Sequence, residues 1–187
     1  MTVVGLLRRE RLRYVLATDV APAAVALAGR NLALLTSAGL DARARELRRR
    51  EVEHGKPGYG EAADAADRLA GQLRTAGGDI TAVAGLADVF NPTALAALLP
   101  APAPDLVLTD LPYDRQTSWQ GSVPSDGEPL RAMIRALCGV LDDHAVIAVT
   151  TEARKVSLGP DVRALQRFRV GTRAAFIGRV GQLRAVA

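Results

Sequence analysis

Short apolar segments recur along this chain and alternate with amphipathic ones, and this alternation restricts the fold more than any other feature. The clearest apolar segments are 14–19, 105–110 and 144–150, and the first two end in Asp19 and Asp110. Strands that are apolar on both sides are typical of parallel sheets covered by helices. We therefore expect an α/β protein with a doubly wound, Rossmann-like sheet.

The other expected elements follow from the same periodicities. A weaker strand is expected at 80–84, and an antiparallel strand pair is expected to end the sheet. In chain order the remaining segments are a helix tail at 2–12, helices at 22–35, 93–99 and 128–141, a short helix after Gly159-Pro160, and final strands near 170–177 and 180–186. We expect residues 1–187 to form one domain.

Residues 41–75 interrupt the α/β alternation. Two charged segments, 41–53 and 61–75, have helical periodicity and are separated by the glycine-rich segment 54–60. An insertion of this length exceeds the usual connection between a helix and a strand. We therefore expect a helical insertion with a functional role.

Composition excludes several classes of protein. One cysteine and two histidines are too few for a disulfide framework or a metal-ligand cluster, so no metal is expected. No apolar run approaches the roughly 20 residues of a membrane span. The first residues are not built like a secretory signal, because the arginines follow the apolar run. We expect a soluble, cytoplasmic protein without a membrane partner.

The net charge of +4 is unevenly distributed. Residues 1–60 and 115–187 each contain 11 basic and six acidic side chains, whereas residues 61–114 contain two basic and eight acidic ones. Basic regions on both sides of an acidic one are consistent with separate sites for an anionic partner and for a hydroxyl-rich or cationic ligand. Solvated helix faces would give the same pattern, and charge alone does not separate the two interpretations.

Three aspartates lie where expected strands end. They are Asp19, Asp88 and Asp110. Ligands of open α/β sheets bind beyond the carboxyl ends of the strands, where carboxylates can accept hydrogen bonds from ribose hydroxyls or an exocyclic amine. The alternative for Asp19 and Asp88 is that each caps the helix that follows it.

The sharpest motif is Asp110-Leu-Pro-Tyr113. Pro112 holds the preceding residue extended, so that the chain leaves the strand rigidly. Asp110 and nearby carbonyls can accept hydrogen bonds from a planar base, and Tyr113 offers a ring for stacking. An ordinary turn with a buried tyrosine is the alternative.

With this motif the chain resembles class I methyltransferases that use S-adenosylmethionine, in which [Asp/Asn]-Pro-Pro-[aromatic] marks enzymes that methylate base nitrogens. More narrowly it is similar to the avilamycin-resistance methyltransferases, which modify a guanine in large-subunit ribosomal RNA. The likeness covers nearly the whole chain, and its main stretches are 3–35, 55–57, 87–90, 106–113, 119 and 145–150.

The resemblance implies S-adenosylmethionine as cofactor, large-subunit (23S) rRNA as partner, and resistance to an orthosomycin antibiotic as a role. It implies three groups of site residues. Cofactor contacts fall on Asp19, Val20, Asp88, Val89 and Asp110; catalysis falls on Asp110, Leu111, Pro112 and Tyr113; substrate contacts fall on Tyr113, Trp119, Arg45, Arg48 and Arg49.

The sequence departs from the family pattern in two places. Leu111 stands where the motif has its first proline. Residues 1–5 do not supply the first strand and the glycine-rich cofactor turn of such enzymes, and we expect a misplaced start codon or a damaged enzyme.

Three alternatives remain at this point: a truncated chain that only binds RNA, a DNA base N-methyltransferase, and a nicotinamide-dependent oxidoreductase. The last would leave the 110–113 motif without a role. The particular guanine, its methylated nitrogen and the oligomeric state are left open.

Overall fold

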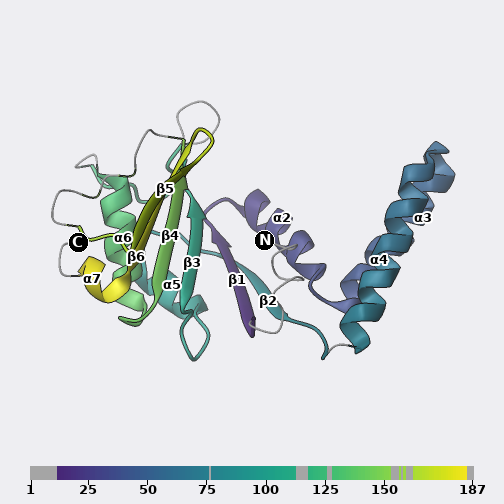
Figure 1. The fold of residues 1–187 in the computed structure, drawn as a ribbon, viewed down its shortest axis with the longest axis horizontal. Helices are drawn as coiled ribbons and strands as arrows, with labels where there is room; N and C mark the ends of the chain where they lie inside the picture. Colours follow the sequence, from purple (N-terminus) through teal and green to yellow (C-terminus); the bar gives the residue numbers. More distant parts are fainter. Residues whose placement is uncertain are drawn as a thin grey trace. The chain divides into compact units, whose positions relative to one another are not determined.

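The computed structural model describes residues 12–75, 77–112, 118–125, 128–152, 156, 158 and 162–184. These residues form two compact units, Met1–Leu86 and Ala87–Ala187, each with its own sheet. Figure 1 gives the element labels used below. The expectation of a single domain stays a prediction.

The first unit is built on a parallel strand pair. β1 (Tyr14–Asp19) pairs with β2 (Thr81–Leu86), and α2 (Pro22–Ala33) packs against both strands. Pro22 begins α2, in agreement with the sequence, because proline's fixed φ suits the first helical turn. The buried side chains of Leu32, Leu35 and Ile80 fill the space between helix and strands.

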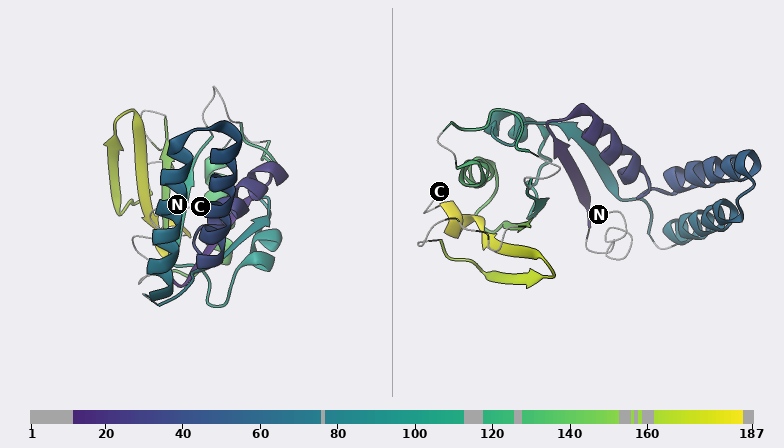
Figure 2. Two further views of the ribbon diagram at one scale, coloured as in Figure 1. Left: turned by 90° about the vertical axis from the view of Figure 1, so that its right-hand side faces the viewer. Right: turned by 90° about the horizontal axis from the view of Figure 1, so that it is seen from above.

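The helical insertion is an antiparallel hairpin of α3 (Ser37–His54) and α4 (Pro57–Thr75), seen side by side in Figures 1 and 2. Both helices are longer than expected, since only Gly55 and Lys56 of the glycine-rich segment lie outside them. Gly55 ends α3 with a φ of 62°, a left-handed conformation that favours glycine. The hairpin has a core of its own, made of Leu40, Ala44, Leu47, Ala63, Ala66, Ala70 and Leu73.

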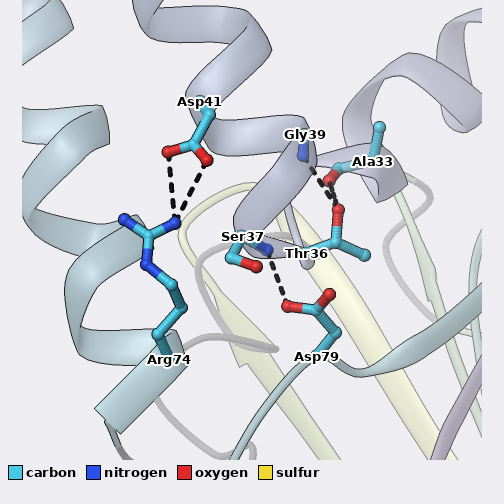
Figure 3. A network of polar contacts seen from close by, with 7 residues as sticks. All are labelled: Ala33, Thr36, Ser37, Gly39, Asp41, Arg74 and Asp79. Atoms are coloured by element: carbon cyan, nitrogen blue, oxygen red, sulfur yellow. Dashed lines mark hydrogen bonds and ion pairs between the residues drawn. The ribbon is translucent and has the colours of Figure 1, made fainter.

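A network of polar contacts fixes the start of the hairpin (Figure 3). The Thr36 hydroxyl donates to Ala33 O at 2.8 Å and accepts from Gly39 N–H at 3.0 Å. Asp79 accepts from Ser37 N–H at 2.7 Å, which ties the segment before β2 to the N-terminus of α3. Gly39 allows a tight passage, because a Cβ there would lie 1.9 Å from Ala33 O.

The second unit contains a four-stranded mixed sheet in the order β3-β4-β6-β5. The strands are β3 (Leu106–Asp110), β4 (Val146–Thr151), β5 (Gln166–Val170) and β6 (Arg173–Arg179). β3 and β4 are parallel, whereas β6 is antiparallel to both β4 and β5. The expected parallel strands and the expected antiparallel ending are therefore confirmed.

Three helices pack on this sheet: α5 (Pro92–Leu98), α6 (Pro129–Val140) and α7 (Val180–Arg184). Phe176, Ile147 and Val149 are fully buried at the centre of the core that they share with α6.

The C-terminal prediction was wrong in detail. Residues 180–184 form α7 instead of a strand, and residues 162–165 are not helical. The chain turns into α7 because Val180 N–H and Gly181 N–H donate to carbonyls of Ala145 and Asp143, while Val180 itself is buried. The expected helix tail lies almost wholly in residues 1–11, outside the described residues.

Candidate active site

The carboxyl ends of β3 and β4 bring together the polar groups of the second unit. Asp110 and Thr150 are register partners, and the Thr150 hydroxyl donates to Asp110 Oδ1 at 2.7 Å. Arg173, at the start of β6, forms an ion pair with Asp110 Oδ2. Asp110 is thus oriented by one group on each of two other strands of the sheet, while its side chain stays 44% exposed.

Leu111 and Pro112 continue from this carboxylate. The Leu111 N–H donates to Thr150 O at 2.8 Å, and its side chain is buried in the core of the unit. Leucine in place of the motif's first proline therefore anchors the exit from β3 by a hydrogen bond and by burial. Tyr113 lies outside the described residues.

A second polar site surrounds Asp88. Its Oδ1 accepts from Phe90 N–H at 2.9 Å, and its Oδ2 accepts from Ser122 N–H at 2.6 Å. Partial burial opposes ionisation, but these hydrogen bonds outweigh it and lower the pKa of the Asp88 carboxyl. The helix-cap interpretation of Asp88 is wrong, because the N-cap of α5 is Asn91, whose side chain accepts from Ala94 N–H.

Trp119 contacts Phe90, which follows Asp88 by two residues. The two rings are tilted, with centroids 5.6 Å apart, and both pack against the core of the second unit. Gly121 has a φ of 85°, and a Cβ there would lie 2.6 Å from the Asp88 carboxylate. The loop that carries Trp119 is therefore held by the Asp88 side chain.

In the first unit, Asp19 ends β1 and is exposed, with half-buried Val20 after it. Asp19 Oδ1 accepts from Ala21 N–H at 2.8 Å, and Ala21, rather than Asp19, is the N-cap of α2. The carboxylate is thus placed at the end of a parallel strand, where this class of sheet binds its ligands.

The three predicted RNA-contacting arginines all lie on α3 and differ in their partners. Arg45 is exposed and has no ion pair with any described residue. Arg49 pairs with Glu53 at 3.2 Å, one helical turn away. Arg48 joins the two helices, since its guanidinium reaches Asp64 at 3.1 Å and Asp67 at 2.5 Å on α4.

No cluster of metal ligands occurs within the described part of the chain. No single described helix is long and apolar enough to cross a membrane, and α2 and α3 meet that test only together, across a bend of 101°.

Comparisons with known proteins agree with this arrangement. A family model described as the rRNA methyltransferase AviRa matches residues 1–173. A 23S rRNA (guanine(2535)-N(1))-methyltransferase of Streptomyces viridochromogenes is 49% identical over 183 residues, which are 98% of this chain and 72% of the relative. The chain belongs to the AviRa family of rRNA methyltransferases.

Two solved structures of AviRa from Streptomyces viridochromogenes also match. One has a TM-score of 0.87 at 48% identity, and the match covers all of this chain and 74% of the solved one. The other has a TM-score of 0.85 at 49% identity, with 97% and 72% covered. Membership of a methyltransferase family confirms the resemblance stated from the sequence.

Around Asp110 and Asp88, the sequence did not point to Thr150, Arg173 or Ser122, whose groups contact these carboxylates. Thr150 was recognisable as the last residue of the apolar segment 144–150, which was expected to form a strand. Arg173 follows the Gly171-Thr172 turn, and only the pairing of β6 with β4 reveals that this turn lies near Asp110. The predicted cofactor and substrate roles of the other residues stay predictions.

Proposed function

We propose that this protein transfers a methyl group from S-adenosylmethionine to N1 of a guanine in 23S rRNA. The observation that carries the proposal is the Asp110 carboxylate, held by Thr150 and Arg173 at the end of β3, in a chain of the AviRa family. The Streptomyces viridochromogenes relative is a 23S rRNA (guanine(2535)-N(1))-methyltransferase, which supports the same substrate here.

Each unit, taken by itself, carries groups suited to part of the adenosine of the cofactor. The exposed Asp19 carboxylate can accept hydrogen bonds from two ribose hydroxyls, and Val20 follows it directly. The segment around Asp88 and Val89 offers a partly apolar surface beside fixed main-chain groups, as an adenine ring requires. When bound, S-adenosylmethionine supplies an electrophilic methyl group on a sulfonium.

Asp110, Leu111 and Pro112 orient the target base in this proposal. The Asp110 carboxylate accepts a hydrogen bond from guanine N1–H and takes up the proton as N1 reacts. The bound cofactor would supply the methyl group that N1 accepts and would become a neutral thioether, while the Asp110 carboxyl would keep the proton from N1. Alignment supplies most of the acceleration of such a displacement, and Tyr113 and Trp119 would hold the base by stacking.

The hairpin supplies phosphate contacts. Arg45 and Arg49 lie four residues apart on one exposed side of α3, so both can meet an RNA backbone. Arg48 keeps α3 and α4 together while remaining 49% exposed. A ribosomal RNA partner would also be consistent with the cytoplasmic location expected from the sequence.

We also propose that a further strand, followed by a glycine-rich turn, completes the sheet that contains β3. Two observations support it. Among the described strands, β3 pairs only with β4, so its other edge has room for a further strand. Leu106 and Leu108 of β3 are each 49% exposed, an unusual state for a strand of a doubly wound sheet.

Transfer of a radioactive methyl group to naked 23S rRNA, assembled large subunits and duplex DNA tests the function. We expect methyl incorporation into rRNA. Primer extension on the product should then stop at one guanine, because methylated N1 blocks base pairing. Asp110→Asn should abolish incorporation, whereas Asp105→Asn, an exposed carboxylate at the opposite end of β3, should not. Labelled duplex DNA would favour the DNA methyltransferase instead, and RNA binding without saturable cofactor binding would favour the RNA-binding fragment.

Orthosomycin resistance is the physiological consequence that we propose. Expression in a sensitive host should raise the inhibitory concentration of avilamycin, and the Asp110→Asn variant should not. Full methylation of the rRNA without a change in sensitivity would refute this role.

A further inference from the structure

Arg173 owes its position to a tight turn. β5 and β6 are joined by Gly171 and Thr172 alone, since Val170 and Arg173 are register partners. Gly171 has a φ of 58° and stands first in this two-residue loop, as in hairpin turns that require glycine there. The register of β6 against β4 then brings Arg173 to the end of the sheet where β3 ends.

At that end Arg173 contacts two carboxylates. Its Nη1 pairs with Asp110 Oδ2, and its Nη2 lies 3.7 Å from Glu152 Oε1. The Arg173 side chain is 39% exposed and that of Asp110 is 44% exposed, so both can be reached from solvent. A fixed acceptor and a fixed cationic donor therefore stand side by side at the carboxyl end of β3.

This pair matches one base better than the others. The pairing edge of guanine presents the O6 acceptor beside the N1–H donor, whereas adenine presents an amine donor beside a bare nitrogen. We propose that Arg173 selects guanine by donating to O6 while Asp110 accepts from N1–H. The inference rests on the function proposed above and adds a residue to it.

The guanidinium also bears on the reaction itself. Negative charge spreads over N1 and O6 of the base when the proton passes from N1 to Asp110. A positive charge aimed at O6 stabilises that charge where it develops, and it is already in place before the reaction. A planar guanidinium holds the carboxylate and O6 together in fixed geometry, which a lysine ammonium on a flexible stem does less well.

The proposed contact between Arg173 and guanine O6 is tested by changing the protein and the base in the same experiment. Arg173→Ala, Arg173→Lys and wild type are assayed on a 23S rRNA fragment with guanine or 6-thioguanine at the methylated position. Sulfur accepts hydrogen bonds poorly, so the ratio of kcat/KM between the two RNAs measures the contact with O6. The matched control is Arg169→Ala, an exposed arginine on the same hairpin whose register partner is Ala174.

We expect Arg173→Ala to lower kcat on the guanine RNA by roughly tenfold to a hundredfold, as for loss of a charged hydrogen bond in the transition state. Its effect on KM should be small, and the guanine to 6-thioguanine ratio should fall toward one. Arg173→Lys should recover part of the rate, while Arg169→Ala should keep both the rate and the ratio.

The outcomes separate the two proposals. A purely structural role for Arg173 predicts equal losses on both RNAs with the wild-type ratio kept, and this result would overturn the inference alone. If the chain binds both RNAs without methylating them, the same ratio is taken from equilibrium dissociation constants and judged in the same way. If wild type neither binds nor methylates either RNA, the proposed function and the inference fall together.

Discussion

Replacing Gly121 with alanine tests how the loop that carries Trp119 is held. The residue has a φ of 85°, and a new Cβ would lie 2.6 Å from Cγ and Oδ2 of Asp88. Real Cβ atoms do not approach a carboxylate so closely, so the loop must move away. The movement would break the bond from Ser122 N–H to Asp88 Oδ2, now 2.6 Å long.

Two effects contribute to the free energy of unfolding that Gly121→Ala loses. A left-handed backbone costs a residue with a Cβ about 1–2 kcal/mol. The lost bond to a carboxylate adds about 1 kcal/mol, less than a buried charged bond because Ser122 is exposed. We therefore expect Gly121→Ala to lower the free energy of unfolding by about 2–3 kcal/mol.

Urea unfolding followed by tryptophan fluorescence measures this loss directly. Trp119 is the single tryptophan of the chain and stands two residues before the substitution. Gly139→Ala in α6 is the control, because Gly139 is exposed and a Cβ added there would have no neighbouring atom within 4 Å. That variant should be neutral or stabilising by up to about 1 kcal/mol.

The pH dependence of the stability difference between wild type and Gly121→Ala isolates the contribution of the hydrogen bond to Asp88. Because the folded pKa of Asp88 lies below its ordinary value of 3.8, its stabilisation is complete above pH 3.8 and is lost as the pH falls through the folded value. The cost of Gly121→Ala should therefore shrink in acid toward the backbone part alone. Equal midpoints for wild type and Gly121→Ala at neutral pH would refute the reasoning.

Three further results are expected. Cys138 is buried and its burial raises the pKa of the thiol, so maleimide should label it only in denaturant. Rapid labelling of the folded protein would contradict the burial of this side chain. Gly39→Ala should destabilise the first unit by about 2–3 kcal/mol in circular dichroism melts, since Ala33 O blocks its Cβ, while Gly71→Ala should not. Arg48→Ala should lower the melting temperature slightly at low ionic strength and not at high salt, because the ion pairs of Arg48 with α4 are exposed and screened by salt. A loss of the same size at both salt concentrations would show that Arg48 acts by packing instead.

Much of the fold could be predicted because local patterns decide it. The strand at 14–19, the helix that begins at Pro22 and the strand ending at Asp110 occupy the residues that apolar periodicity and proline assign to them. The C-terminal end was mispredicted because residues 180–184 read equally well as strand or helix. Distant carbonyls of Ala145 and Asp143, invisible in a local pattern, decide for the helix.

The candidate site likewise contains residues that local sequence patterns reveal and residues that only the folded sheet reveals. Asp110 was recognisable from its place at a strand end and from the proline that follows Leu111. Arg173 is 63 residues away in the chain, and nothing local distinguishes it from the other arginines. Its role depends on strand order, on antiparallel register and on a two-residue turn, which are properties of the assembled sheet.

The separate core of the α3–α4 hairpin has a consequence for how this family can change. Four of its seven buried residues are alanines, and none of the seven belongs to the core beneath α2. Helical turns can therefore be added or removed at the Gly55-Lys56 end, about 5.4 Å at a time, without repacking the strands. Under the RNA-binding role proposed for α3, such a change in hairpin length would alter how far the helix extends along RNA and would leave the groups around Asp110 unchanged.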